Sequence, residues 1–192
     1  MIKRPGKADL TAAYGRAIGD VLPPPGTRLS VLFCGINPSL YSGATGHHFA
    51  RPGNRFWPAL HRSGCTDRLL APDEQDLLPS YGLGITNLVD RATARADELT
   101  DAELRTGGER LAALVERAAP DYVAVAGVTA YRTAFGSRDA IIGPQPDKIG
   151  AARLWVLPNP SGLNASWTAP RIAEEFRELR QTAGLRSRLE VD

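Results

Sequence analysis

The stretch LSVLFCGINPS, at residues 29–39, passes from an apolar run into a polar loop within a few positions. A short continuous apolar run between turn-forming residues is typical of a strand buried on both faces of a parallel sheet. Three similar runs follow: GITNLV at residues 84–89, DYVAVAG at 121–127 and RLWVLP at 153–158. The sequence therefore predicts four strands.

Helical patterns lie between these strands. Asn54 stands where it would cap the helix RFWPALHRSG, and Thr100 with Glu103 forms a capping box before a second helix, which two glycines weaken. Further helices are expected at residues 9–22, 72–81, 128–135 and 169–183, and a loop at 143–150. Because strand and helix alternate, the predicted fold class is a three-layer α/β/α domain with a central, mainly parallel four-stranded sheet.

Composition sets limits on the whole chain. The 192 residues, 43% hydrophobic and 23% charged, suit one globular domain over residues 1–192, with a core at about 29–184 and a frayed basic tail. The net charge of +2 permits a polyanionic partner without requiring one. Cys34 and Cys65 are too few for a disulfide framework or for four cluster ligands. No apolar run suits a signal peptide or the roughly 18 residues of a membrane span, so the cytoplasm is the expected location.

The first and last predicted strands both end in polar loops, GINPS at residues 35–39 and PNPSGLN at 158–164. Alone, each loop is explained by an ordinary β-turn, because Asn, Pro, Ser and Gly are common turn residues. Proline also fixes the backbone, and glycine lets another molecule come close. In an open parallel sheet, ligands bind at the carboxyl ends of the strands, so we expect the two loops to form the two sides of one cleft.

Three stretches together resemble the family of mismatch-specific uracil-DNA glycosylases and thymine-DNA glycosylases: GINPSLYSGATGHHFARPGNRFW, GITNLVDRATARADEL and LPNPSGLNA. The resemblance extends over about residues 29–179. Members of this family flip a uracil or thymine opposite guanine out of duplex DNA and cleave its N-glycosidic bond, which leaves an abasic site. Extrusion is needed because the bond cannot be reached inside the base stack, and a mispaired base is easier to extrude. The implied partner is double-stranded DNA with a mismatched uracil or thymine.

The resemblance assigns roles around the first loop. Asn37 matches the residue that holds the attacking water, and a neutral amide positions water without taking its proton. Phe49 matches the residue that stacks on the flipped base, and the backbone N–H groups of Ile36 and Phe49 would bind the pyrimidine oxygens. Ser39 and Ser42 complete the implied base pocket. The alternative for Phe49 is a position in the core.

The resemblance also assigns roles around the last loop. Gly162 and Leu163 match the family's wedge, in which an apolar side chain enters the space left by the flipped nucleotide, and Asn164 would contact the unpaired partner base. The alternative for Leu163 is a side chain folded onto the core. The sequence departs from the family at two positions. Ser39 replaces a usual glycine and would crowd the pocket floor, and Ala165 replaces an arginine that is usual in the bacterial mismatch-specific branch and would contact DNA.

Asp90, after the second predicted strand, is a further catalytic candidate outside the family's usual assignment. Topology predicts that it reaches the same crevice, where a carboxylate within one water of Asn37 would act as a base or stabilise a sugar cation. The alternative is an ion pair with Arg91 or a cap on the following backbone. Other residues near the motifs have ordinary expected positions: a solvated loop for His47 and His48, the core for Phe56 and Trp57, and DNA phosphates or solvent for Arg51 and Arg55.

The predicted function is that of a monofunctional DNA-repair glycosylase, because no lysine lies in either motif to form a Schiff base with the sugar. It would act as a monomer on uracil, thymine or modified pyrimidines in G·U and G·T mismatches. No His, Cys and carboxylate cluster has metal-ligand spacing, so neither a metal nor a cofactor is expected. Two alternatives stay open: a broad uracil-DNA glycosylase that also acts on single strands and A·U pairs, and a non-catalytic module that binds damaged or single-stranded DNA.

Overall fold

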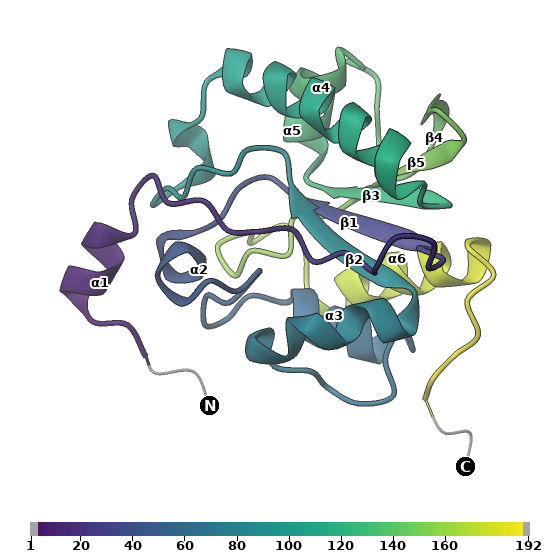
Figure 1. Ribbon diagram of the computed structural model, residues 1–192, viewed down its shortest axis with the longest axis horizontal. Helices are drawn as coiled ribbons and strands as arrows, with labels where there is room; N and C mark the ends of the chain where they lie inside the picture. Colours follow the sequence, from purple (N-terminus) through teal and green to yellow (C-terminus); the bar gives the residue numbers. More distant parts are fainter. Residues whose placement is uncertain (1–3, 190–192) are drawn as a thin grey trace.

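The computed structural model describes residues 4–189, and within this range the centre of the molecule is a five-stranded sheet in the order β2-β1-β3-β5-β4 (Figure 1). The first four strands in this order are parallel, and β4 is antiparallel to β5. The predicted mainly parallel sheet is confirmed, with five strands in place of four. The strands are β1 (Val31–Gly35), β2 (Leu83–Asn87), β3 (Tyr122–Ala126), β4 (Gly143–Ile149) and β5 (Ala152–Leu157).

The extra strand is β4, and the prediction of a loop at residues 143–150 was wrong. The β4 backbone pairs with β5 from Gly143 opposite Val156 to Ile149 opposite Ala152, with an irregularity between its two ends. Two prolines, which lack an N–H, made the segment resemble a loop. They are tolerated because β4 lies at the edge of the sheet, where one side of the strand needs no ladder partner.

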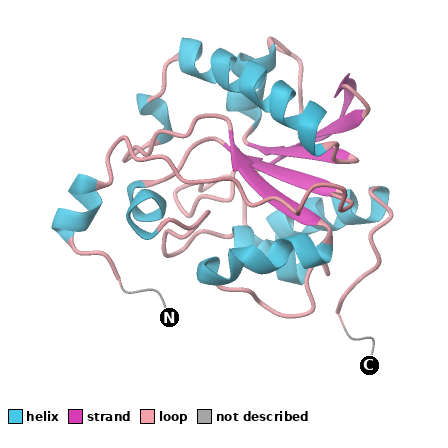
Figure 2. Cartoon of the chain, viewed as in Figure 1, coloured by secondary structure: helices cyan, strands magenta, loops and turns pink. Residues whose placement is uncertain are grey.

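Helices cover both faces of the sheet, as Figures 1 and 2 show. On one face lie α4 (Asp101–Ala118) and α5 (Val128–Phe135), and on the other lie α3 (Phe56–Arg62) and α6 (Ala169–Thr182). Alternate residues of β1 enter the two cores: Leu32 and Cys34 pack on the α4 side, and Val31 and Phe33 pack on the α3 and α6 side. The strands are buried on both faces, which explains their continuous apolar sequence.

Helix α4 begins where its capping box predicts. Thr100 Oγ1 accepts from the Glu103 backbone N–H at 3.2 Å, and Glu103 Oε2 accepts from the Thr100 backbone N–H at 2.8 Å. The two glycines in this helix have a packing role. A Cβ at Gly107 would lie 2.4 Å from Leu88 O, and a Cβ at Gly108 would lie 2.7 Å from the backbone oxygen of α5 residue Ala134. The cap predicted at Asn54 is displaced by one residue: Arg55 is the N-cap of α3 and makes no side-chain cap hydrogen bond, while Asn54 Oδ1 accepts from the Phe56 N–H at 2.9 Å.

The amino-terminal segment differs from the helix predicted at residues 9–22. Only α1 (Lys7–Ala12) is helical there, and the chain then turns at Gly15, which has a φ of +77°. Val21 pairs with Ile85 of β2 in an antiparallel bridge. Ala13 and Val21 are buried because the segment packs against the sheet and the loop after β2, and this burial explains the apolar spacing.

Three short elements complete the chain: helix α2 (Leu40–Thr45) and the 3₁₀ helices Pro72–Tyr81 and Ala96–Glu98. The segment after α6, which was expected to fray, is fixed as far as the structure describes it: Arg188 N donates to Gly64 O at 2.8 Å, and Arg180 Nη1 donates to Leu185 O at 2.7 Å. Residues 190–192 of the predicted tail lie outside the described range. None of the helices within residues 4–189 has the length and apolar character needed to cross a membrane.

Candidate active site

A cleft opens at the carboxyl ends of the parallel strands. It is lined by Ala126 of β3, by Ile18 and by four loop segments: residues 36–39 with 42; residues 48, 49, 51 and 54; residue 87 with 93–96; and residues 159–161 with 163. The loops after β1 and β5 are therefore the two sides of one cleft, which confirms this expectation. Asn37, Phe49 and Leu163 all line it.

The amide of Asn37 is fixed in one orientation. Asn37 Nδ2 donates to Arg91 O at 2.8 Å and to Thr93 Oγ1 at 2.7 Å. A backbone carbonyl only accepts, and the Thr93 hydroxyl gives its own proton to Arg95 O at 2.7 Å, so the Asn37 atom that meets both groups must be the nitrogen. Both N–H groups of the amide are used. The Oδ1 atom is left to accept a hydrogen bond in the cleft.

Phe49 forms an aromatic wall of the cleft. Its ring stacks on the ring of Phe56 at a centroid distance of 4.0 Å and an interplanar angle of 14°, and its backbone has a φ of +52°, rare for a residue with a side chain. Gly35 makes room for this ring, since a Cβ there would lie 3.2 Å from Phe49 Cζ. Phe49 is half-buried, whereas Phe56 and Trp57 are buried in the core as predicted. The arrangement suits stacking of a flat ligand on the ring of Phe49.

The floor of the cleft contains two linked hydroxyl groups. Ser39 caps α2, because its Oγ accepts from the Ser42 backbone N–H at 3.2 Å. Its hydroxyl also donates to Ser42 Oγ at 3.3 Å, and the Ala50 N–H donates to the same Ser42 oxygen at 3.3 Å. Ser42 Oγ thus accepts twice, so its own proton is available to a ligand acceptor.

Asn87 and His48 also line the cleft. Asn87 was not predicted as a site residue, and His48 was predicted in a solvated loop. Asn87 ends β2 and is buried, and His48, expected in a solvated loop, is 1% exposed. His48 Nε2 meets Gly19 O at 2.9 Å and must donate, so Nδ1 accepts from Asn87 Nδ2 at 3.4 Å. Burial lowers the pKa of His48, which favours this neutral form. The signal for Asn87 was present: a polar residue at the end of a buried strand, as at Asn37.

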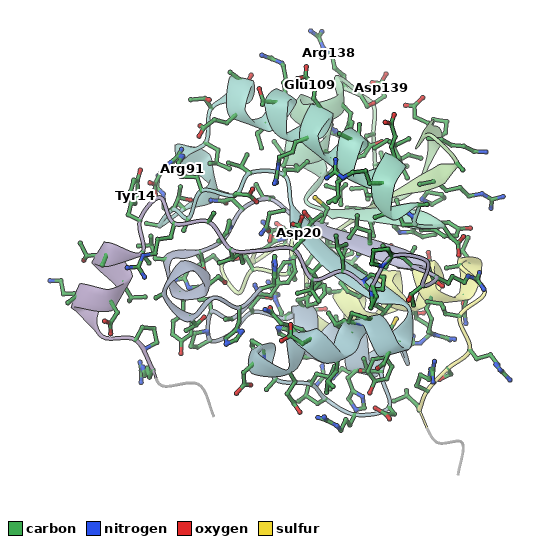
Figure 3. The ribbon with its side chains drawn as sticks, viewed as in Figure 1. Tyr14, Asp20, Arg91, Glu109, Arg138 and Asp139 are labelled. Atoms are coloured by element: carbon green, nitrogen blue, oxygen red, sulfur yellow. The ribbon has the colours of Figure 1, made fainter. Side chains whose placement is uncertain are left out.

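Asp90 does not line this cleft. Its Oδ2 accepts a hydrogen bond from Arg110 of α4, its Oδ1 has no hydrogen-bond partner within the described residues, and it faces a separate surface pocket with Glu103 and Gly107. Burial raises the pKa of Asp90, and the charge of Arg110 opposes this shift. Its ion pair is with Arg110 and not with Arg91, which pairs with Glu103 beside Tyr14 (Figure 3). The backbone around Asp90 lies beside Asn37, since Val89 N donates to Ile36 O at 2.9 Å and Asn37 Nδ2 donates to Arg91 O, but the Asp90 carboxylate is directed to α4.

The loop after β5 presents Leu163 at the rim of the cleft with its side chain 66% exposed, so it is not folded onto the core. Gly162 lies against backbone, since a Cβ there would be 2.7 Å from Gly53 O. Asn164 makes hydrogen bonds within the loop, from Nδ2 to Asn159 O at 3.0 Å and from the Ser166 N–H to Oδ1 at 3.3 Å. In this conformation, both ends of its amide are therefore engaged away from a partner base.

The two arginines near the first motif differ. Arg51 is exposed at the edge of the cleft, where a phosphate could reach it. Arg55 was expected to touch phosphates or solvent, but its guanidinium donates to backbone oxygens of the loop after β5. Among residues 4–189, no group of three or more His, Cys, Asp or Glu side chains is arranged to hold a metal ion.

The fold and the cleft define an α/β protein with a ligand site at the carboxyl edge of a parallel sheet, walled by an oriented amide, an aromatic ring and an exposed leucine. The family model of the uracil DNA glycosylase superfamily matches residues 23–183, and the chain belongs to this superfamily. The resemblance is thereby confirmed at the level of the superfamily. Membership supports a DNA glycosylase, a hydrolase that acts on uracil in DNA.

Proposed function

We propose that the protein is a monofunctional DNA glycosylase that flips uracil out of G·U mismatches, and thymine or modified pyrimidines from related mismatches, and leaves an abasic site. The observation that carries the proposal is the orientation of Asn37. Its two N–H groups are bound by Arg91 O and Thr93 Oγ1, so its free oxygen can only accept, as the attacking water requires. An amide that could rotate would present its oxygen or its nitrogen in turn and would not fix the water.

This geometry supports hydrolysis of the glycosidic bond. Water held by Asn37 Oδ1 attacks C1′ of the sugar, the bond from C1′ to N1 of the base breaks, and its electron pair leaves with the base as an anion. The proton that water loses neutralises the departing base or passes to solvent, because Asn37 cannot take it. No lysine is among the described residues that line the cleft, which supports a monofunctional mechanism without a Schiff base to the sugar.

The walls of the cleft support recognition of a flipped pyrimidine. Phe49 offers an aromatic surface, and the Ser42 hydroxyl has a proton to donate to a ring carbonyl oxygen. Asn87 adds an amide whose Nδ2 is directed to His48, which leaves Oδ1 to accept from a ring N–H. Uracil and thymine carry both complementary groups, a carbonyl oxygen and a ring N–H, side by side.

The test is cleavage of a labelled duplex with one G·U pair, followed by alkali to break abasic sites. Duplexes with G·T and A·U pairs and a single strand with one uracil are treated in parallel. Breaks at G·U, fewer at G·T and none at A·U are expected. Equal breaks on A·U and the single strand would instead assign a broad uracil-DNA glycosylase, and no breaks on any substrate with retained binding would assign a DNA-binding module.

A further inference from the structure

The guanidinium of Arg55 is surrounded by backbone oxygens of a single loop, residues 160–167, which we name the wedge loop because it carries Leu163. Arg55 lies just before α3, far from this loop in the sequence. Its acceptors are Pro160 O, at 3.5 Å from Nε, Trp167 O from Nη1, and Ser161 O and Asn164 O from Nη2, the last at 2.9 Å. One side chain thus binds four carbonyls distributed along the whole loop.

This use of an arginine is specific. The described residues provide no carboxylate that pairs with Arg55, so the carbonyl dipoles are the groups that balance its charge. A guanidinium has five N–H donors in a rigid plane, and it can serve several acceptors at once. A lysine ammonium, a compact charge with three donors on a flexible stem, cannot reach the same set of oxygens.

Two backbone contacts hold the wedge loop at the same place. The Arg55 N–H donates to Pro160 O at 2.9 Å, and Gly162 lies so close to Gly53 O that a Cβ would be 2.7 Å away. Leu163 sits between Ser161 and Asn164, whose carbonyls Arg55 binds. The exposed Leu163 side chain is therefore carried at a fixed point, although little else packs against it.

We propose that Arg55 is a positioning residue that holds the wedge loop ready, so that Leu163 enters the DNA stack without a loop having to be ordered first. The inference rests on the proposed function and adds a second residue to base extrusion. Ordering a loop and its side chains on binding costs free energy, and a loop that is already rigid avoids this cost. Arg55 acts through Leu163 and touches neither the base nor the water.

The experiment is a double-mutant cycle on single-turnover cleavage of the G·U duplex, with Arg55→Lys, Leu163→Ala and both together. Arg55→Lys alone is expected to slow cleavage about tenfold, because small displacements of a positioned group have effects of this order. In the Leu163→Ala background, the same exchange should change the rate less than about twofold, since the side chain it positions is gone. On a duplex in which the base pairs beside the G·U pair are also mismatched, so that little stacking must be opened, Arg55→Lys should match the parent.

Two further variants separate positioning from other effects. Arg62→Lys makes the same exchange at an exposed site on α3 and should leave both rates unchanged. Gly162→Ala pushes the wedge loop away from Gly53 while residue 55 stays an arginine, and it should reproduce the loss of rate on duplex DNA. This test remains available where Arg55→Lys fails to fold. Additive losses in the cycle, or an intact duplex rate in Gly162→Ala, would overturn the role of Arg55. An inactive parent would contradict the proposed function itself, so the two failures are distinct.

Discussion

At the scale of single residues, Asn37 is the group whose loss should matter most. Rotating its amide by half a turn would place Oδ1 against Arg91 O and leave two acceptors in contact, so only one orientation is stable. Asn37→Ala is expected to slow single-turnover cleavage of a G·U duplex by about two decades or more with little change in DNA binding. Thr93→Ser keeps the hydroxyl acceptor and should remain near the parent rate. Equal rates for Asn37→Ala and the parent would remove Asn37 from the mechanism.

His48 predicts a pH dependence of stability. Burial lowers its pKa in the folded protein below the ordinary value of 6.5, so the unfolded chain binds the proton more tightly. The stability that neutral His48 contributes is therefore complete above about pH 6.5 and is lost as the pH falls through the folded pKa. The melting temperature should decline below pH 6.5, and His48→Gln should have a flatter profile over the same range. Parallel profiles for the two proteins would mean that His48 is not the group responsible.

At the scale of elements, helix propensity favours alanine at position 107 of α4, whereas packing favours glycine. Alanine in place of glycine favours a helix by about 1 kcal/mol. A Cβ at Gly107, however, would lie 2.4 Å from Leu88 O and 2.9 Å from Leu88 C, and these backbone atoms cannot move aside cheaply. Gly107→Ala should therefore lower the melting temperature, while Thr106→Ala, at the exposed neighbouring position of α4, should leave it equal or higher. A more stable Gly107→Ala protein would show that the two segments can separate.

Asp90 belongs to the contact between α4 and the segment after β2. Its ion pair with Arg110 is more than a third exposed on both sides, so its removal should cost only about 0–1 kcal/mol. Asp90→Asn is expected to keep a near-parent single-turnover rate between pH 5 and 9, with a slightly lower melting temperature. A stable variant whose rate falls tenfold or more, and which loses the acid limb of the parent's pH profile, would make Asp90 catalytic after all.

The elements themselves were predictable where one local signal dominated. The four parallel strands were visible as buried runs, and α4 begins at its capping box. Strand β4 was missed because the prolines that suit an edge strand also suit a loop. The helix predicted at residues 9–22 was too long because burial against β2 produced a helix-like spacing of apolar residues in a turning chain.

At the scale of the whole molecule, each side of the cleft is held by an arginine that donates to backbone oxygens. Arg110 of α4 donates to Asn87 O and Leu88 O on one side, and Arg55 donates to the wedge loop on the other. The two arginines come from opposite layers of the fold. The sequence predicted which loops meet at the cleft but not these contacts, because the partners of Arg55 are more than 100 residues away and follow no local pattern.

The position of the wedge loop at the rim allows a gain-of-function test of DNA binding. Ala165 is exposed two residues beyond Leu163, at a position where the bacterial mismatch-specific branch of the resembled family usually has arginine, so under the proposed function we expect a side chain there to reach the DNA backbone. Each phosphate neutralised on B-DNA steepens the dependence of log binding constant on log salt by about 0.9. Ala165→Arg should therefore strengthen duplex binding at low salt and steepen this slope by about one.

The neutral exchange Ala165→Gln provides the control for that prediction. It adds a polar side chain without charge, and its salt slope should equal that of the parent. Binding is measured by fluorescence anisotropy of a labelled G·U duplex across a salt series, with Asn37→Ala as the background so that little product forms during the measurement. If Ala165→Arg and Ala165→Gln both have the parent's salt slope, residue 165 faces away from DNA. The wedge loop then does not approach the duplex in the orientation that would place Leu163 in the base stack. If only the arginine steepens the slope, the rim that carries Leu163 is the surface that docks on the phosphate backbone.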